Sequence, residues 1–143
     1  MAIRYFNDDT TYRLPHKRLT SRWLVSCAGE EGCHIGEISY VFCSSERLLE
    51  INRQFLGHDY FTDVITFDDS DLEDTRTLNG EIYIDTATVA DNAKRYGSTA
   101  LMEMRRVIVH GLLHLCGHGD KTPPEEKRMH ELEDHYLQHW DEL

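Results

Sequence analysis

The order of apolar and polar positions along the chain predicts both strands and helices. Four short runs are rich in β-branched and aromatic residues and predict strands at residues 3–6, 37–43, 62–69 and 80–86. Other segments carry apolar residues at intervals of three and four, which is the spacing of one helical face. These predict five helices, at residues 14–28, between Ser44 or Ser45 and Gly57, at 87–96, at 100–116 and from Pro123 onward.

Residues that favour helix ends support these boundaries. Gly57 and Gly97 follow the last apolar residues of two helices, and Gly29 marks the expected end of the first. Ser98 or Thr99 is suited to cap the long fourth helix. Mixed strands and helices of this kind predict an α/β or α+β domain, in which a small mixed sheet of about four strands packs with about five helices. We expect one domain over residues 1–143, and the order of its strands cannot be read from the sequence.

Composition narrows the class of protein. The chain has 143 residues, of which 40% are apolar, and this is enough for one core. Fifteen Lys and Arg residues against 26 Asp and Glu give a net charge of −11, which argues against broad, non-specific attraction to nucleic acid. The first ten residues lack a signal peptide's apolar core, and no apolar run approaches the ~18 residues of a membrane helix. We therefore expect a cytoplasmic protein with no membrane partner.

The four cysteines show no spacing typical of a zinc ribbon. Cys27, Cys33, Cys43 and Cys116 form no CxxC pair. Reduced, partly buried thiols are the expected state.

The chemistry of the chain is concentrated in the run "VIVHGLLHLCGHGD". His110 and His114 are four residues apart, so on a helix they share one face with Cβ atoms about 5–6 Å apart. This spacing allows two imidazole nitrogens to bind one metal ion. Apolar residues surround both histidines, and burial favours the neutral imidazole that a metal requires. The sequence therefore predicts a metal site.

A third ligand must come from beyond this helix. Gly117 lies where a left-handed residue can end the helix, so Asp120 can return its carboxylate toward the histidines. The resulting pattern, HxxxHxxGxxD, has the spacing of the longer zinc-protease motif, whose last position is usually histidine. His118 is the alternative third ligand, but it requires the helix to continue through Gly117. Cys116 lies about 200° around the helix from His114 and is not expected to bind.

Two histidines and a carboxylate leave a coordination position for water, as in catalytic zinc sites. We expect one zinc ion, which lowers the pKa of its water toward about 7 and polarises the scissile group. Zinc proteases carry a glutamate directly after the first histidine as general base, whereas this chain has Gly111 there. Peptide hydrolysis by the usual route therefore lacks its general base, and a protease is kept only as an alternative. A metal-dependent hydrolase of another substrate remains an alternative.

The chain resembles the YbeY family of bacterial endoribonucleases. The run "HGLLHLCG" resembles the family's HGxLHLxG motif, and "HDYFTDVITF" resembles its D-x-x-TDV segment. "INRQF" and "NGEIYID" are similar to its LN-containing helix and G-[DE]-I strand, and Met129 and Glu133 fall where its final helix carries similar residues. The likeness covers roughly residues 36–134.

This resemblance implies a zincin-like domain with one zinc ion. It also implies a role in processing ribosomal RNA, especially the ends of small-subunit RNA, and in ribosome quality control. The implied partners are the small ribosomal subunit and ribosome-associated proteins. By position, the metal ligands are His110, His114 and Asp120, where the family's third ligand is commonly histidine. The family's basic residue in the LN helix falls on Leu56, so Arg53, one helical turn earlier, is the substitute we expect to contact substrate.

Several further residues are candidates around the metal. His114 is expected to be essential for catalysis, and His118 or His58 can exchange protons in the absence of a glutamate base. Thr62 and Asp63 are expected to fix the loop before their strand as capping or turn groups.

Cations near the metal are the expected phosphate contacts. Arg105 and Arg106 lie one turn before His110, and Lys121 follows Asp120.

The other alternative for the function is a ribosome assembly factor that contains a structural zinc ion and cleaves nothing.

Overall fold

The computed structural model describes all 143 residues and contains a four-stranded mixed sheet. Its strands are β1 (Ala2–Asn7), β2 (His34–Cys43), β3 (Val64–Asp68) and β4 (Thr77–Asp85). They lie in the order β1-β2-β4-β3. The pairs β1–β2 and β2–β4 are parallel, whereas β3 runs antiparallel to β4 at one edge.

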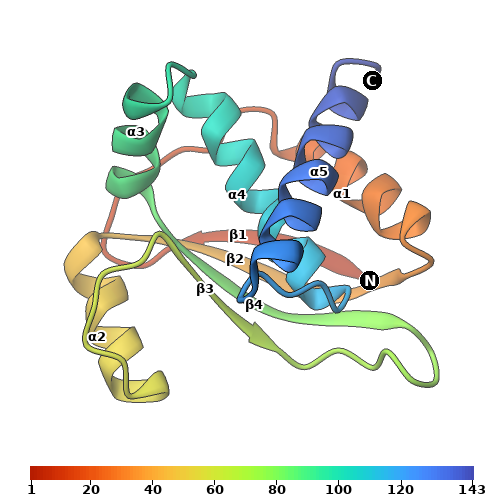
Figure 1. Ribbon diagram of the computed structural model, residues 1–143, viewed down its shortest axis with the longest axis horizontal. Helices are drawn as coiled ribbons and strands as arrows, with labels where there is room; N and C mark the ends of the chain where they lie inside the picture. Colours follow the sequence, from red (N-terminus) through yellow and green to blue (C-terminus); the bar gives the residue numbers. More distant parts are fainter.

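Five helices cover the two faces of this sheet unequally (Figure 1). They are α1 (Lys17–Glu30), α2 (Ser45–Leu56), α3 (Thr86–Arg95), α4 (Ala100–Leu115) and α5 (Pro123–Trp140). Helices α1, α4 and α5 bury their apolar sides in a core cluster of 25 residues, whereas α2 packs on the other face through a cluster of four. The expected class, with about four strands and five helices, is confirmed.

Side-chain caps begin four of the helices. Ser44, rather than Ser45, caps α2, and Thr99, rather than Ser98, caps α4. The end of α2 at Gly57 is confirmed, because this residue has a φ of 68°, which favours glycine. Caps satisfy backbone groups that a helix end leaves unpaired.

The first helix differs from its expected bounds. It begins at Lys17 rather than residue 14, because His16 precedes it in a left-handed conformation. Its end near Gly29 is confirmed to within one residue, because α1 ends at Glu30, and the chain then turns at Gly32, whose φ is 74°. Glu30 and Glu31 consequently lie at the end of α1.

Three strands are longer than expected, β1 by one residue at each end and β2 and β4 at their starts. β2 and β4 each begin three residues before the predicted start, and their extensions pair with one another at His34 and Thr77. Pairing between segments distant in the sequence creates these extensions, so local periodicity gives no sign of them. None of the helices has the length and apolar character needed to cross a bilayer.

Helix α4 lies against the sheet and determines where the functional residues project. Gly111 is fully buried there, and a Cβ atom at this position would lie 2.8 Å from Ile82 of β4. The close approach explains the absence of the glutamate found in zinc proteases, since this position faces the sheet. The four cysteines are buried and free.

Candidate metal centre

Three donor atoms from α4 and the following loop converge on one point. His110 Nε2 lies 3.0 Å from His114 Nε2, and Asp120 Oδ2 lies 3.3 Å and 3.2 Å from these two nitrogens. The two imidazole rings stand nearly perpendicular, at 84°. Their side chains are 18% and 25% exposed, so the group opens to solvent on one side.

The second nitrogen of each ring is held by a hydrogen bond. His110 Nδ1 donates to Glu133 Oε2 over 2.7 Å, and His114 Nδ1 donates to the carbonyl of His118 over 2.9 Å. Each bond places the proton on Nδ1 and leaves the lone pair of Nε2 directed at the convergence point. Metal-binding histidines are typically oriented in this way.

Opposite influences act on the two imidazoles. Burial lowers the pKa of His110, but the Glu133 carboxylate more than compensates, so this pKa is raised overall. Burial and the neighbouring His110 lower the pKa of His114. His114 therefore stays neutral and able to bind a cation. Glu133 favours the doubly protonated form of His110, so a metal must displace the proton on His110 Nε2.

The donor set fits a divalent transition metal. Zn²⁺ binds nitrogen and oxygen ligands at about 2.0–2.2 Å in tetrahedral geometry, which places neighbouring ligand atoms about 3.3 Å apart. The three separations here match that edge length. Two neutral imidazoles and one carboxylate are also the ligand types that zinc accepts.

The corner that returns Asp120 depends on Gly117. This residue has a φ of 99°, and the amide of His118 donates to Leu113 as the helix ends. A side chain at Gly117 would be strained by its backbone and would also lie 3.3 Å from Leu72. The glycine therefore allows the chain to bring the carboxylate of Asp120 back to α4.

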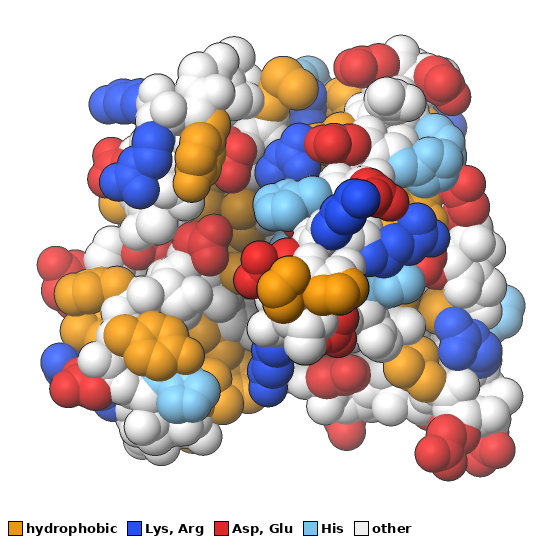
Figure 2. All heavy atoms as spheres, in the orientation of Figure 1, with side chains coloured by type: hydrophobic (Ala, Val, Ile, Leu, Met, Phe, Trp, Pro, Cys, Tyr) orange, Lys and Arg blue, Asp and Glu red, His pale blue; other side chains and the backbone are white.

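The donors lie in a cleft of about 760 Å³ between β3, the loop after α2, α4 and α5. Figure 2 shows this hollow between α2 and α5, with acidic and histidine side chains along it. Arg106 lines the cleft but is held by Glu133 at 2.9 Å and Asp134 at 2.6 Å. Lys121 lines it and forms no ion pair. Unpaired positive charge in the cleft is therefore sparse.

Asp63 contributes a further carboxyl group to the cleft. Burial raises its pKa, while its own backbone amide and His110 partly oppose that rise. The expectation that Asp63 only fixes its loop is thus incomplete. Its main-chain carbonyl does accept from Asp85, which joins the loop to β4.

Two expected site residues are not brought to the cleft. The ring of His118 turns away after Gly117, and its Nε2 contacts Glu31 of α1 at 2.6 Å. The guanidinium of Arg53 pairs with Asp59, six residues further along the chain. Neither side chain lines the cleft, because a nearer carboxylate holds each of them.

Other candidates divide between the cleft and the rest of the surface. His58 lines the cleft and stacks on Tyr60 with ring centroids 5.1 Å apart. Leu56 lines it as well, at the position where related sequences are expected to carry a basic residue. Arg105 lies outside, over the ring of Trp140.

Sequence reasoning gave Glu133 no role, although its side chain is only 3% exposed and supports His110. The signal was present, because Glu133 interrupts the apolar side of α5 formed by Met129, Leu132 and Tyr136. A charged residue within a buried face usually has a charged partner.

Comparisons with known proteins point to one family. A family model described as "Endoribonuclease YbeY" matches residues 4–141. A protein of that name from Bacteroides thetaiotaomicron is 42% identical over 137 residues, covering 96% of this chain and 98% of the relative. One from Cytophaga hutchinsonii is 45% identical over 133 residues, covering 93% and 92%. The solution structure of TM1509 from Thermotoga maritima has a TM-score of 0.65 at 28% identity, covering 97% of this chain and 89% of that one.

Proposed function

The chain belongs to the YbeY family, and on that premise we propose that it is a zinc-dependent endoribonuclease that matures ribosomal RNA. His110, His114 and Asp120 are its proposed metal ligands, and the ends of small-subunit RNA are its proposed substrate. The observation that carries the proposal is the convergence of these three donors inside an open cleft.

Zinc is the preferred ion because the ligands are two imidazoles and one carboxylate. When bound, such an ion polarises a phosphate oxygen and makes a coordinated water easier to deprotonate. The residues of the chain supply the remaining requirements, which are proton transfer, substrate binding and exclusion of competing groups.

Proton transfer is assigned to Asp63. Its carboxyl group shares the cleft with the three ligands, and burial raises its pKa toward the range useful for a general base at neutral pH. In this proposal the Asp63 carboxylate accepts the proton of the attacking hydroxyl group, whose oxygen bonds to phosphorus while the P–O bond to the leaving ribose oxygen breaks, and the leaving oxygen takes up a proton from His58 or water. His58, on the same cleft, is the second group able to exchange a proton.

Substrate binding is expected to depend on bases as well as phosphates. Tyr60 and Tyr96 line the cleft and are 56% and 69% exposed. The ring of Tyr96 and the face of Tyr60 that His58 does not cover can therefore stack on unpaired bases. Lys121 is the proposed phosphate contact. Single-stranded RNA ends present both groups, whereas a duplex keeps its bases stacked inside.

The net charge of −11 limits unaided attraction to RNA. We therefore propose that a ribosome-associated protein or the small subunit itself brings the enzyme to its substrate. A cytoplasmic location follows from this role.

The test is cleavage of precursor small-subunit RNA by metal-loaded protein, together with metal analysis. His114→Ala should abolish both cleavage and metal retention in the cleft, whereas His34→Ala, at an exposed histidine in no candidate metal group, should leave both unchanged. Cleavage by metal-free His114→Ala protein would reject the proposal. Metal binding and small-subunit association without any cleavage by the wild type would instead indicate an assembly factor.

A further inference from the structure

A second group of metal-type ligands lies on the opposite side of α5 from the cleft. His135 Nε2 lies 2.9 Å from Glu30 Oε1, and His139 Nδ1 lies 3.3 Å from Glu30 Oε2. The two imidazole centroids are 4.5 Å apart. All three residues offer ligand atoms within 4.8 Å of one another.

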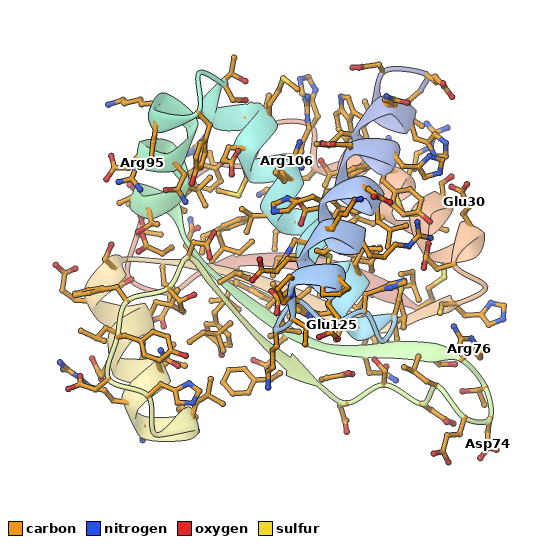
Figure 3. All side chains as sticks on the ribbon, in the orientation of Figure 1. Glu30, Asp74, Arg76, Arg95, Arg106 and Glu125 are labelled. Atoms are coloured by element: carbon orange, nitrogen blue, oxygen red, sulfur yellow. The ribbon has the colours of Figure 1, made fainter.

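The helices explain this convergence. His135 and His139 are four residues apart on α5, so they share a face, and Glu133 projects from the other side of the same helix toward Arg106. Glu30 is the last residue of α1. Figure 3 shows Glu30 and Arg106 on opposite sides of α5. The three ligands therefore join α1 to α5 at a distance from the cleft.

Two features favour a cation here over a simple pair of charged side chains. The C-terminal end of α1 carries partial negative charge from the helix dipole, and this attracts positive charge. The neighbouring Glu31 is fixed by Tyr136 and His118, so the end of α1 is already held against α5. Ligands held in place before binding lose little conformational entropy when an ion arrives.

We propose that Glu30, His135 and His139 form a second site for a divalent transition-metal ion, with zinc as its test ion. The ion fastens the end of α1 to α5. The ligand side chains are 42%, 46% and 30% exposed, so water completes the coordination and the site binds more weakly than the cleft. This inference does not rest on the proposed function.

Zinc stoichiometry tests the proposal, measured by equilibrium dialysis of untagged protein so that no added histidines compete. The wild type should bind two ions, and His114→Ala and His139→Ala should each bind one. The double variant should bind none. If His139→Ala binds as many ions as the wild type, or if His114→Ala binds none, the second site does not exist.

Thermal unfolding gives an independent measurement in the His114→Ala background. Saturating zinc at neutral pH should raise Tm by about 3–8 °C, because an ion that binds only the folded state stabilises it. Adding His139→Ala should remove this rise, whereas adding His34→Ala should preserve it. Glu30→Gln should weaken zinc binding at least about tenfold. Equal zinc response with and without His139 would overturn the proposal.

Discussion

Helices α4 and α5 each carry two histidines four residues apart with a carboxylate between their rings, yet the two groups differ in their surroundings. On α4, His110 and His114 lie in a cleft, and each ring is held through Nδ1 by a further partner. On α5, His135 and His139 are more exposed and contact Glu30 directly. The spacing places two rings together, and the surroundings determine what they can do.

The difference lies in the groups behind the rings. Glu133 and a main-chain carbonyl orient the α4 pair, and the cleft beside it holds Asp63. The α5 pair lines neither this cleft nor the pocket between β1 and α1. We therefore expect the first group to support catalysis and the second only to bind an ion and stabilise the fold.

The largest expected effect separates the two groups by activity. His114→Ala should lower RNA cleavage by more than about 100-fold, because it removes a proposed ligand of the proposed catalytic ion. His139→Ala, the matched variant on α5, should change the cleavage rate by less than about twofold, because substitutions on the surface away from the cleft have small effects. Initial rates on precursor RNA at saturating zinc measure both. Similar losses in the two variants would erase the distinction between the groups.

The next effect tests the support behind one ring. Glu133→Gln still accepts a hydrogen bond from His110 but removes the negative charge, so zinc affinity in the cleft should fall about 10–100-fold. Competition with a chelating dye measures this loss. Glu131→Gln, at an exposed position of the same helix, serves as the control and should leave zinc affinity in the cleft unchanged. An unaltered affinity in Glu133→Gln would show that the carboxylate does not orient the ligand.

A smaller effect compares two glycines. Gly117→Ala should destabilise the fold by about 1–2 kcal/mol, because alanine is strained at a φ of 99°, and it should displace Asp120. Gly29→Ala should stabilise by about 0.5–1 kcal/mol, since Gly29 lies inside α1 and a Cβ there meets nothing within 4 Å. Urea unfolding measures both. Destabilisation by both alanines would contradict the assigned backbone roles.

Local sequence features predicted the elements and the three converging donor residues, because helical period and a glycine corner act over a few residues. His110, His114 and Asp120 come together within one helix and its exit. The side-chain positions of His118 and Arg53 were not predictable from the sequence. His118 contacts Glu31, which only the tertiary fold brings close, and Arg53 pairs with Asp59 of the loop after α2. The α5 group was not predictable either, because it depends on the packing of the end of α1 against α5.

The smallest effect concerns two carboxyl groups, Asp63 in the cleft and Glu30 on the surface. Burial raises the pKa of Asp63 above its ordinary value of 3.8, so in metal-free protein the folded state binds this proton more tightly than the unfolded chain. Stability is therefore lost as pH rises from 3.8 through the raised pKa, and the full cost persists at neutral pH. Asp63→Asn cannot ionise, so it should unfold about 1–3 °C above the wild type at neutral pH, with the gap closing in acid. Glu30→Gln should show no such gain. Bound zinc favours a nearby carboxylate and should shrink the gap, whereas a gap independent of pH would mean that ionisation of Asp63 is not its cause.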